Sequence, residues 1–251
     1  MRVDLALVER GLCESRTKAQ ALIAAGAVTA DGKTVRKPSL DVLTDCVLSV
    51  RQEAMPFVSR GGLKLQGALD AFDLDVTDLV AVDLGASTGG FTDCLLRRGA
   101  RRVYAIDAGR DQLHPSLRAD PRVISREGLN ARDLDVDAIG GEKADLMVCD
   151  LSFISQTKVY DSVCRLLKVG GHFISLIKPQ FEAGPAYLNK HGIVRDERVH
   201  RRVKEQIRSA AREQGLICLG MADSPIAGGD GNREYLALFC LSEQTPKEET
   251  V

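Results

Sequence analysis

The sequence predicts an α/β protein: a mainly parallel seven-stranded sheet between helices, with a small α+β domain in front of it. From residue 79 onward, short apolar runs alternate with helix-like segments, which is typical of parallel strands joined by helices. Only residues 224–233 separate the last two apolar runs, too few for a helical crossover, so we expect those strands to be antiparallel. A length of 251 residues suits one sizeable domain and one small one.

The first fifty residues have a different pattern from the rest. A short helix is expected over 1–10 and a second over 16–25, with Ser15 as its N-cap and Gly26 just after its end. The pair Asp31-Gly32 between the β-prone runs 27–30 and 33–35 indicates a tight hairpin. A further strand is expected at 46–50. Residues 51–59 lack a clear period, so we place the domains at 1–58, linker included, and 59–245.

The larger domain should contain seven strands, at 80–84, 102–107, 122–125, 144–150, 171–178, 216–222 and 234–241. Helices are expected between them at 90–98, 112–117, 154–167 and 197–214. One more helix, over 63–72, should precede the first strand, with Ser59 as its cap.

Composition excludes several classes of protein. Aromatic residues make up 4% and Trp is absent, which argues against an RNA binder built on an aromatic platform. The longest stretch without Asp, Glu, Lys or Arg is residues 19–30, too short for a membrane span, and the acidic N-terminus is unlike a signal peptide. The seven cysteines form no CxxC motif, which fits a reducing cytoplasm and no metal site. Residues 1–64 carry ten Lys and Arg against seven Asp and Glu, so the basic excess lies at the front.

A glycine-rich turn follows the first strand of the larger domain. Asp83 ends that strand, and the residues expected around a ligand here are Gly85, Ser87, Thr88, Gly89, Gly90 and Phe91. Ligands of such sheets bind beyond the carboxyl ends of the strands, where glycines let the backbone approach closely. The turn matches neither a Walker A loop nor GxGxxG. Asp107, which ends the second strand, suits the hydroxyl pair of a ribose. The alternative is a tight turn without a ligand.

Two further strands end in charged residues. Asp150 ends the fourth strand and Lys178 ends the fifth, so both should point into the same crevice. Lys64 lies in the helix before the sheet, and Glu234 begins the last strand.

The small domain resembles the S4 RNA-binding domain. The resemblance is carried by the helix–helix–hairpin order together with Gly11, Leu12, Ala19, Ile23 and Gly32, among others. It implies that cations on the second helix and the hairpin contact RNA phosphates, which releases counterions. The candidate RNA-binding residues are Arg2, Arg16, Lys18, Lys33, Arg36 and Lys37. The alternative is a solvated charged face.

The larger domain resembles the FtsJ-type methyltransferases, whose sheet is Rossmann-like. That resemblance implies an S-adenosylmethionine site at the glycine turn and Asp107, with Asn130 near the adenine. It also implies the tetrad of ribose 2′-O-methyltransferases, formed by Lys64, Asp150, Lys178 and Glu234. A lysine can deprotonate a ribose hydroxyl only when its own pKa is depressed, as by burial and a second ammonium. Lys178 is the candidate base, Lys64 the neighbouring cation, and the two carboxylates position them. Asp150, Glu234 and bulk water are the alternative bases.

The whole chain resembles the TlyA, or haemolysin A, family. The runs 59–65, 83–96, 178–184 and 192–196 all match, which implies cytidine 2′-O-methylation of ribosomal RNA in the small subunit and, as a second target, the large subunit. Residues 55–58 depart from the junction usual in the family, which puts any switching by the linker in doubt. Two rival functions are kept open: a membrane-active haemolysin, which a liposome leakage assay would reveal, and an RNA-binding protein without activity, which cofactor binding would exclude.

Overall fold

The computed structural model describes residues 1–50, 56–229 and 231–243. The chain divides into two compact units, Met1–Pro56 and Phe57–Val251. The larger unit therefore begins two residues before the expected boundary, because Phe57 is buried in its core and the Val58 amide donates to the Asp93 carboxylate at 2.8 Å. Most of the expected linker, residues 51–55, lies outside the described residues. In the described part of the chain, no helix is long and apolar enough to cross a membrane.

The smaller unit packs two helices against a three-stranded sheet. The helices are α1 (Val3–Glu9) and α2 (Arg16–Ala24), and the strands are β1 (Val28–Ala30), β2 (Lys33–Thr34) and β3 (Leu48–Val50), in the order β2-β1-β3. Ser15 caps α2 as expected, because its hydroxyl accepts from the Lys18 amide at 3.2 Å. Asp31 and Gly32 both have positive φ and close the expected hairpin.

The larger unit contains a seven-stranded sheet in the order β6-β5-β4-β7-β8-β10-β9. Its strands are β4 (Val80–Leu84), β5 (Arg102–Asp107), β6 (Val123–Glu127), β7 (Ala144–Cys149), β8 (Leu167–Ile177), β9 (Leu216–Asp223) and β10 (Tyr235–Leu241). The first five are parallel, and β10 runs antiparallel to both β8 and β9, as expected. Counted along the chain, the order is 3-2-1-4-5-7-6, with the switch point between β4 and β7.

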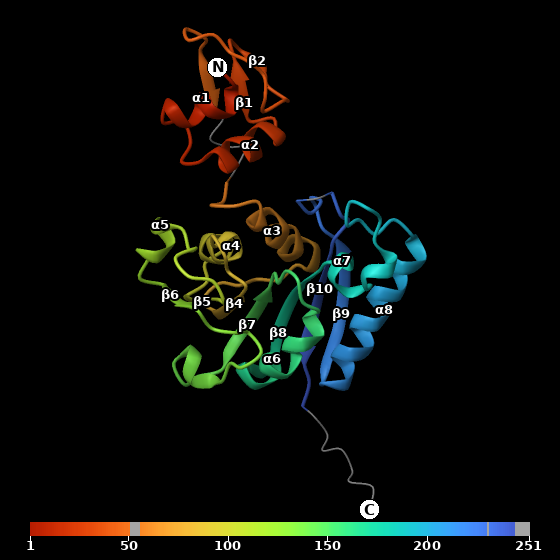
Figure 1. The fold of residues 1–251 in the computed structure, drawn as a ribbon. Coiled ribbons are helices and arrows are strands. Elements are labelled where there is room, and N and C mark those ends of the chain that lie inside the picture. Colours follow the sequence, from red (N-terminus) through yellow and green to blue (C-terminus); the bar gives the residue numbers. More distant parts are fainter. Residues whose placement is uncertain (51–55, 230, 244–251) are drawn as a thin grey trace, which may run out of the picture. The chain divides into compact units, whose positions relative to one another are not determined.

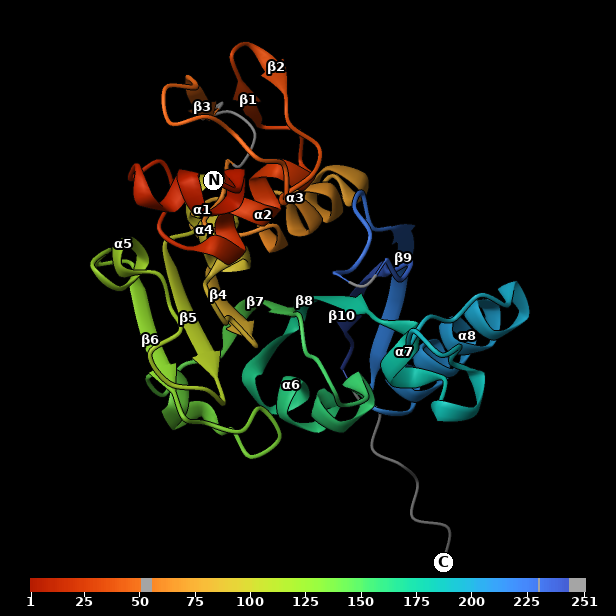
Figure 2. The ribbon, with the colours of Figure 1, turned by 45° about the horizontal axis from the view of Figure 1, so that its top comes forward.

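Helices cover both faces of this sheet (Figures 1 and 2). On one face lie α3 (Gly61–Phe72), α4 (Gly90–Arg97) and α5 (Pro115–Arg118), and on the other lie α6 (Tyr160–Leu166) and α8 (Glu197–Glu213). A hydrophobic core lies on each face of the sheet, and successive side chains of a strand point into the two cores in turn. In β10, Tyr235 and Ala237 face α8, while Leu236 and Leu238 face α3. This two-sided burial explains why β4 is apolar almost throughout.

Several element boundaries differ from the expectation. The strand expected at 171–178 begins at Leu167, and the helix expected at 154–167 opens with a 3₁₀ turn (Gln156–Val159). The helix expected at 112–117 has only four residues. Ser59 does not cap α3: Arg60 is the N-cap residue and no side chain caps the helix. Arg60 also has helical φ and ψ and so lacks the extended backbone typical of an N-cap residue. A short helix, α7 (Pro179–Glu182), was not expected.

Candidate active site

The four residues of the expected tetrad form two ion pairs. Nζ of Lys64 lies 2.6 Å from Oε2 of Glu234, and Nζ of Lys178 lies 2.5 Å from Oδ1 of Asp150. Asp150 and Lys178 follow the neighbouring parallel strands β7 and β8, whereas Glu234 precedes the antiparallel strand β10. Because β10 runs the opposite way, its start meets the ends of β7 and β8 at one edge of the sheet. The fold thus brings together four residues that span 170 positions in sequence.

Three of these four charged side chains are largely buried. Lys64 is 8% exposed, Lys178 9% and Glu234 3%. A buried charge is tolerated when an opposite charge and hydrogen bonds compensate its lost hydration, and each lysine has its own carboxylate here. Gly228 makes room for Glu234, since a Cβ at Gly228 would lie 2.5 Å from Oε1 of the carboxylate. The expectation that Lys64 acts on Lys178 as a neighbouring cation stays a prediction.

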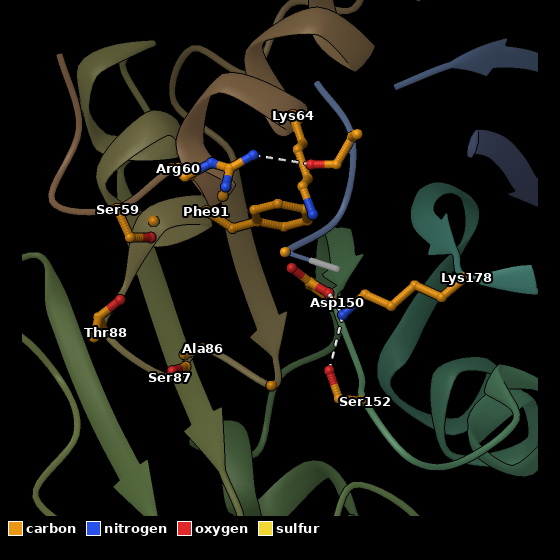
Figure 3. A pocket seen from close by; sticks show the side chains of 15 residues that line it. Ser59, Arg60, Lys64, Ala86, Ser87, Thr88, Phe91, Asp150, Ser152 and Lys178 are labelled. Carbon is orange, nitrogen blue, oxygen red and sulfur yellow. Dashed lines mark hydrogen bonds and ion pairs between the residues drawn. The ribbon is translucent and has the colours of Figure 1, made fainter. Parts of the chain in front are cut away.

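A cavity of about 310 Å³ opens beside the two pairs (Figure 3). Lys64, Asp150 and Lys178 line one part of it, and the glycine turn lines another through Gly85 and Gly90. Its other lining residues include Ser59, Arg60, Ser87, Thr88, Phe91 and Ser152. Ammonium and carboxylate groups therefore face the same space as the glycine turn.

The loop after β7 is tied to the segment after β8. Glu182 of α7 accepts from the Ser155 hydroxyl at 2.6 Å and from the Gln156 amide at 2.9 Å. Burial raises the pKa of Glu182 above its usual value, against these two hydrogen bonds. Nearer the cavity, Lys178 Nζ donates to the Ser152 hydroxyl at 2.9 Å. Both contacts fix the loop that carries Asp150 relative to Lys178.

Two aromatic rings, one exposed and one partly buried, lie near Lys178. Phe153 is 86% exposed and has a φ of +68°, which is rare and strained for so large a residue. Its ring centroid lies 5.1 Å from that of Phe181, whose centroid is 6.0 Å from Nζ of Lys178. Sequence reasoning assigned no role to these two rings. The available signal was an aromatic residue placed three positions after a strand-end acid.

Each glycine of the turn makes room for protein rather than for solvent. A Cβ at Gly85 would lie 2.7 Å from the Asp150 carbonyl oxygen, and one at Gly90 would lie 2.2 Å from the Ser59 hydroxyl. A Cβ at Gly89 would lie 2.3 Å from Leu117, and Gly89 does not line the cavity. Gly85 and Gly89 also have positive φ, which favours glycine. The turn is thus required by tight packing, and a role of Gly89 toward a cofactor stays a prediction.

Asp83 lies beneath the turn and lines neither this cavity nor the one described next. Its side chain is fully buried, and Oδ2 accepts from the amide of Thr92 at 3.0 Å and from its hydroxyl at 2.7 Å. Oδ1 is buried and has no hydrogen-bond partner among the described residues. Burial raises the pKa of Asp83 to about 7, against the Thr92 hydrogen bond and with a further increase from the charge of Asp150. Asp83 therefore holds the start of α4 in place.

A second cavity, of about 700 Å³, adjoins the first and shares Gly85, Ser87, Asp150 and Ser152 with it. Asp107 and Asn130 line it, together with Leu129 and Phe153. Asp107 accepts from the Ser87 amide at 2.8 Å, so the two strand ends are joined across the turn. Asn130 Oδ1 accepts from the Arg132 amide at 3.1 Å, so this oxygen is engaged within its own turn. The two cavities therefore form one two-part hollow, and polar groups line both parts.

The cations expected to contact RNA are arranged in two ways within the smaller unit. Arg2 and Arg16 both contact Asp4, with Arg2 donating at 3.1 and 3.0 Å and Arg16 at 2.9 Å. Asp4 is fully buried, and hydrogen bonds from Gln20, then from the two arginines, hold its pKa well below the usual range.

The other four cations of this set lie on the surface or near it. Lys18 pairs with Glu14 at 3.1 Å. Lys33, Arg36 and Lys37 are exposed, and no ion pair reaches them from the described part of the unit. The buried carboxylate thus fixes two guanidinium groups, while the hairpin and the residues after it leave three cations facing solvent.

Comparison with known proteins gives two family matches. The family model for FtsJ-like methyltransferases matches residues 57–240, and that for the S4 domain matches residues 1–45. The chain is 44% identical over 235 residues to 16S/23S rRNA (cytidine-2′-O)-methyltransferase TlyA of Mycobacterium tuberculosis H37Rv, covering 93% of this chain and 87% of that protein. It is 39% identical to Hemolysin A of Brachyspira hyodysenteriae, covering 96% and 100% of the two chains.

A solved structure extends these matches to three dimensions. It is described as "Putative hemolysin from Streptococcus thermophilus" and is 39% identical, with a TM-score of 0.78. The match covers 97% of this chain and 89% of that one. Both units of the chain therefore have relatives of the same organisation.

Proposed function

The chain belongs to the FtsJ-like methyltransferase family and carries an S4 domain, and from this premise we propose that it methylates the 2′-hydroxyl of cytidine in ribosomal RNA. S-adenosylmethionine is the methyl donor of this enzyme. The observation that supports the 2′-oxygen as the target is the pair of lysine–carboxylate contacts at the cavity. A ribose hydroxyl is a weak nucleophile and needs a base, and the largely buried amine of Lys178 offers one in its neutral form.

The two-part hollow fits S-adenosylmethionine in its chemistry. The cofactor has a polar amino-acid end and an adenosine end, and the hollow has polar groups in both cavities. Asp107 would hold the ribose hydroxyls, Asn130 would lie near the adenine, and the glycine turn with Ser87 and Thr88 would hold the methionine end. The bound cofactor supplies an electrophilic methyl group on a cationic sulfur.

The tetrad accounts for the proton. In its neutral form, Lys178 accepts the proton of the 2′-hydroxyl while the ribose oxygen forms its bond to the methyl carbon, and the electron pair of the breaking carbon–sulfur bond stays on sulfur. Asp150 then faces an ammonium again, the arrangement present in the structure. Lys64, held by Glu234, lines the same part of the cavity as Asp150 and Lys178. Alignment of the two substrates should contribute much of the acceleration, since the reaction is an in-line displacement.

Two features of this chain suit an RNA substrate. Lys33, Arg36 and Lys37 present exposed positive charge on the S4 unit, and Arg2 and Arg16 present guanidinium groups fixed by Asp4. Near Lys178, the exposed ring of Phe153 offers a stacking surface for an unpaired base. A substrate of this kind places the enzyme in the cytoplasm, where ribosomes are found.

The experiment that tests the proposal is methyl transfer from labelled cofactor to free ribosomal subunits and to whole ribosomes, followed by mapping of the modified nucleotide. We expect label in ribosomal RNA, at a cytidine ribose. The matched variants are Lys178→Ala, which should abolish transfer, and Lys158→Ala, which removes an exposed lysine that lines neither cavity and should keep it. Label in protein or lipid, or full transfer by Lys178→Ala, would contradict the proposal.

A further inference from the structure

The amine of Lys178 has two neighbours of different kinds. Oδ1 of Asp150 is 2.5 Å away as an ion-pair partner, yet it has no hydrogen-bond partner among the described residues, so the contact lacks the angles of a hydrogen bond. The Ser152 hydroxyl, by contrast, accepts a hydrogen bond from the same nitrogen at 2.9 Å. The Asp150 carboxylate therefore attracts the amine electrostatically, whereas the Ser152 hydroxyl fixes the direction of one of its N–H bonds.

We infer that Ser152 is a positioning residue that aims the lone pair of the Lys178 amine into the cavity, an inference that rests on the proposed role of Lys178 as base. A neutral lysine amine has two N–H groups and one lone pair, arranged tetrahedrally. With one N–H directed at Ser152 and the second on the side of Asp150, the lone pair takes the remaining direction. Lys178 and Ser152 line the same cavity (Figure 3), so the ribose would approach the amine from the direction that these two contacts leave open.

The place of Ser152 is itself fixed. Three residues further on, Ser155 is held by Glu182, which lies four residues after Lys178. The loop and the segment that carries the base are therefore connected twice, once by Glu182 and once by Ser152. Ser152 is exposed, which leaves room for an added methyl group. A threonine there keeps the hydroxyl, whereas an alanine removes it and with it the hydrogen bond to the Lys178 amine.

The test compares Ser152→Ala and Ser152→Thr in the full chain, with ribosomal RNA as substrate. Without the hydroxyl, the amine turns among three staggered orientations, so the aligned fraction falls and the single-turnover rate of methyl transfer should drop about 3- to 10-fold. The KM for RNA and the Kd for S-adenosylmethionine should change less than twofold. Ser152→Thr should restore the rate to within twofold of wild type. Ser209→Ala, on α8 and lining neither cavity, is the matched control and should leave every value unchanged.

Three results would overturn the inference: a wild-type rate in Ser152→Ala, a failure of threonine to restore the rate, or a raised KM or Kd that shows direct contact with a substrate. Lys178→Ala separates this inference from the proposed function. If that variant is inactive while Ser152→Ala is fully active, only the role of Ser152 is wrong. If Lys178→Ala is fully active, the base itself is wrong.

Discussion

Replacement of Asp83 by asparagine should remove a specific pH dependence of stability. Burial raises the folded-state pKa of this carboxyl from 3.8 to about 7, a shift of about three units. Between these two values the folded protein holds a proton that the unfolded chain has lost, so stability falls as pH rises through this range. At about 1.4 kcal/mol per unit, the loss attributable to Asp83 reaches about 4 kcal/mol above pH 7. Asparagine carries no charge and can still accept from the Thr92 amide.

The assay is urea denaturation of the cofactor-free protein and of Asp83→Asn at intervals from pH 4.5 to 8.5. The free energy of unfolding of the variant, minus that of the wild type, should increase with pH and level off near pH 8. Subtraction cancels the titration of all other groups that the substitution leaves unchanged. A flat difference would show that the carboxyl titrates normally in the fold. Such a flat difference would contradict the reasoning.

Three further predictions concern the turn, the buried pair and the small unit. Gly89→Ala should lower the free energy of unfolding by about 1–3 kcal/mol, because its Cβ would overlap Leu117 of α5. Calorimetry should show this loss of stability even where the affinity for the cofactor is unchanged. Lys64→Met should cost about 3–5 kcal/mol in urea denaturation by leaving Glu234 buried and unpaired. The double variant with Glu234→Gln should recover part of that loss; a strictly additive result would show that the two residues are uncoupled. Lys33→Glu with Lys37→Glu should weaken RNA binding and reduce its log–log salt slope by about 1 per lost contact, and an unchanged slope would exclude these lysines from the RNA surface.

Elements with a strong local signal were predictable from the sequence. The strands at 80–84 and 102–107 agree residue for residue, because strands buried on both faces are apolar throughout. The hairpin at Asp31-Gly32 follows from the positive φ that such turns require. Short elements such as α7 were missed, because a four-residue helix has too few positions to show a period. Ser59 was expected to cap α3 because serine is a favoured N-cap residue, but residue type alone does not reveal that Arg60 takes the N-cap position.

The candidate site was predictable in its residues and not in its contacts. Their places at strand ends pointed to Asp150 and Lys178, because parallel strands bring their carboxyl ends to one edge. Lys64 and Glu234 were added by the resemblance to ribose 2′-O-methyltransferases, and the structure pairs them. Which lysine pairs with which carboxylate depends on distances across the sheet, which no local pattern encodes. The same limit applies to Asp83, whose role toward the cofactor stays a prediction: no motif shows that the fold buries it beneath the turn. Only the packing of α4 over Asp83 reveals this burial.

The most direct test of the central claim is nucleoside analysis by mass spectrometry of ribosomal RNA treated with the protein and S-adenosylmethionine. The account predicts 2′-O-methylcytidine from the wild type and none from Lys178→Arg, since a guanidinium cannot accept the proton at neutral pH. Calorimetry should show that this variant still binds the cofactor. A methyl group on a base, or equal amounts of 2′-O-methylcytidine from both proteins, would contradict the account.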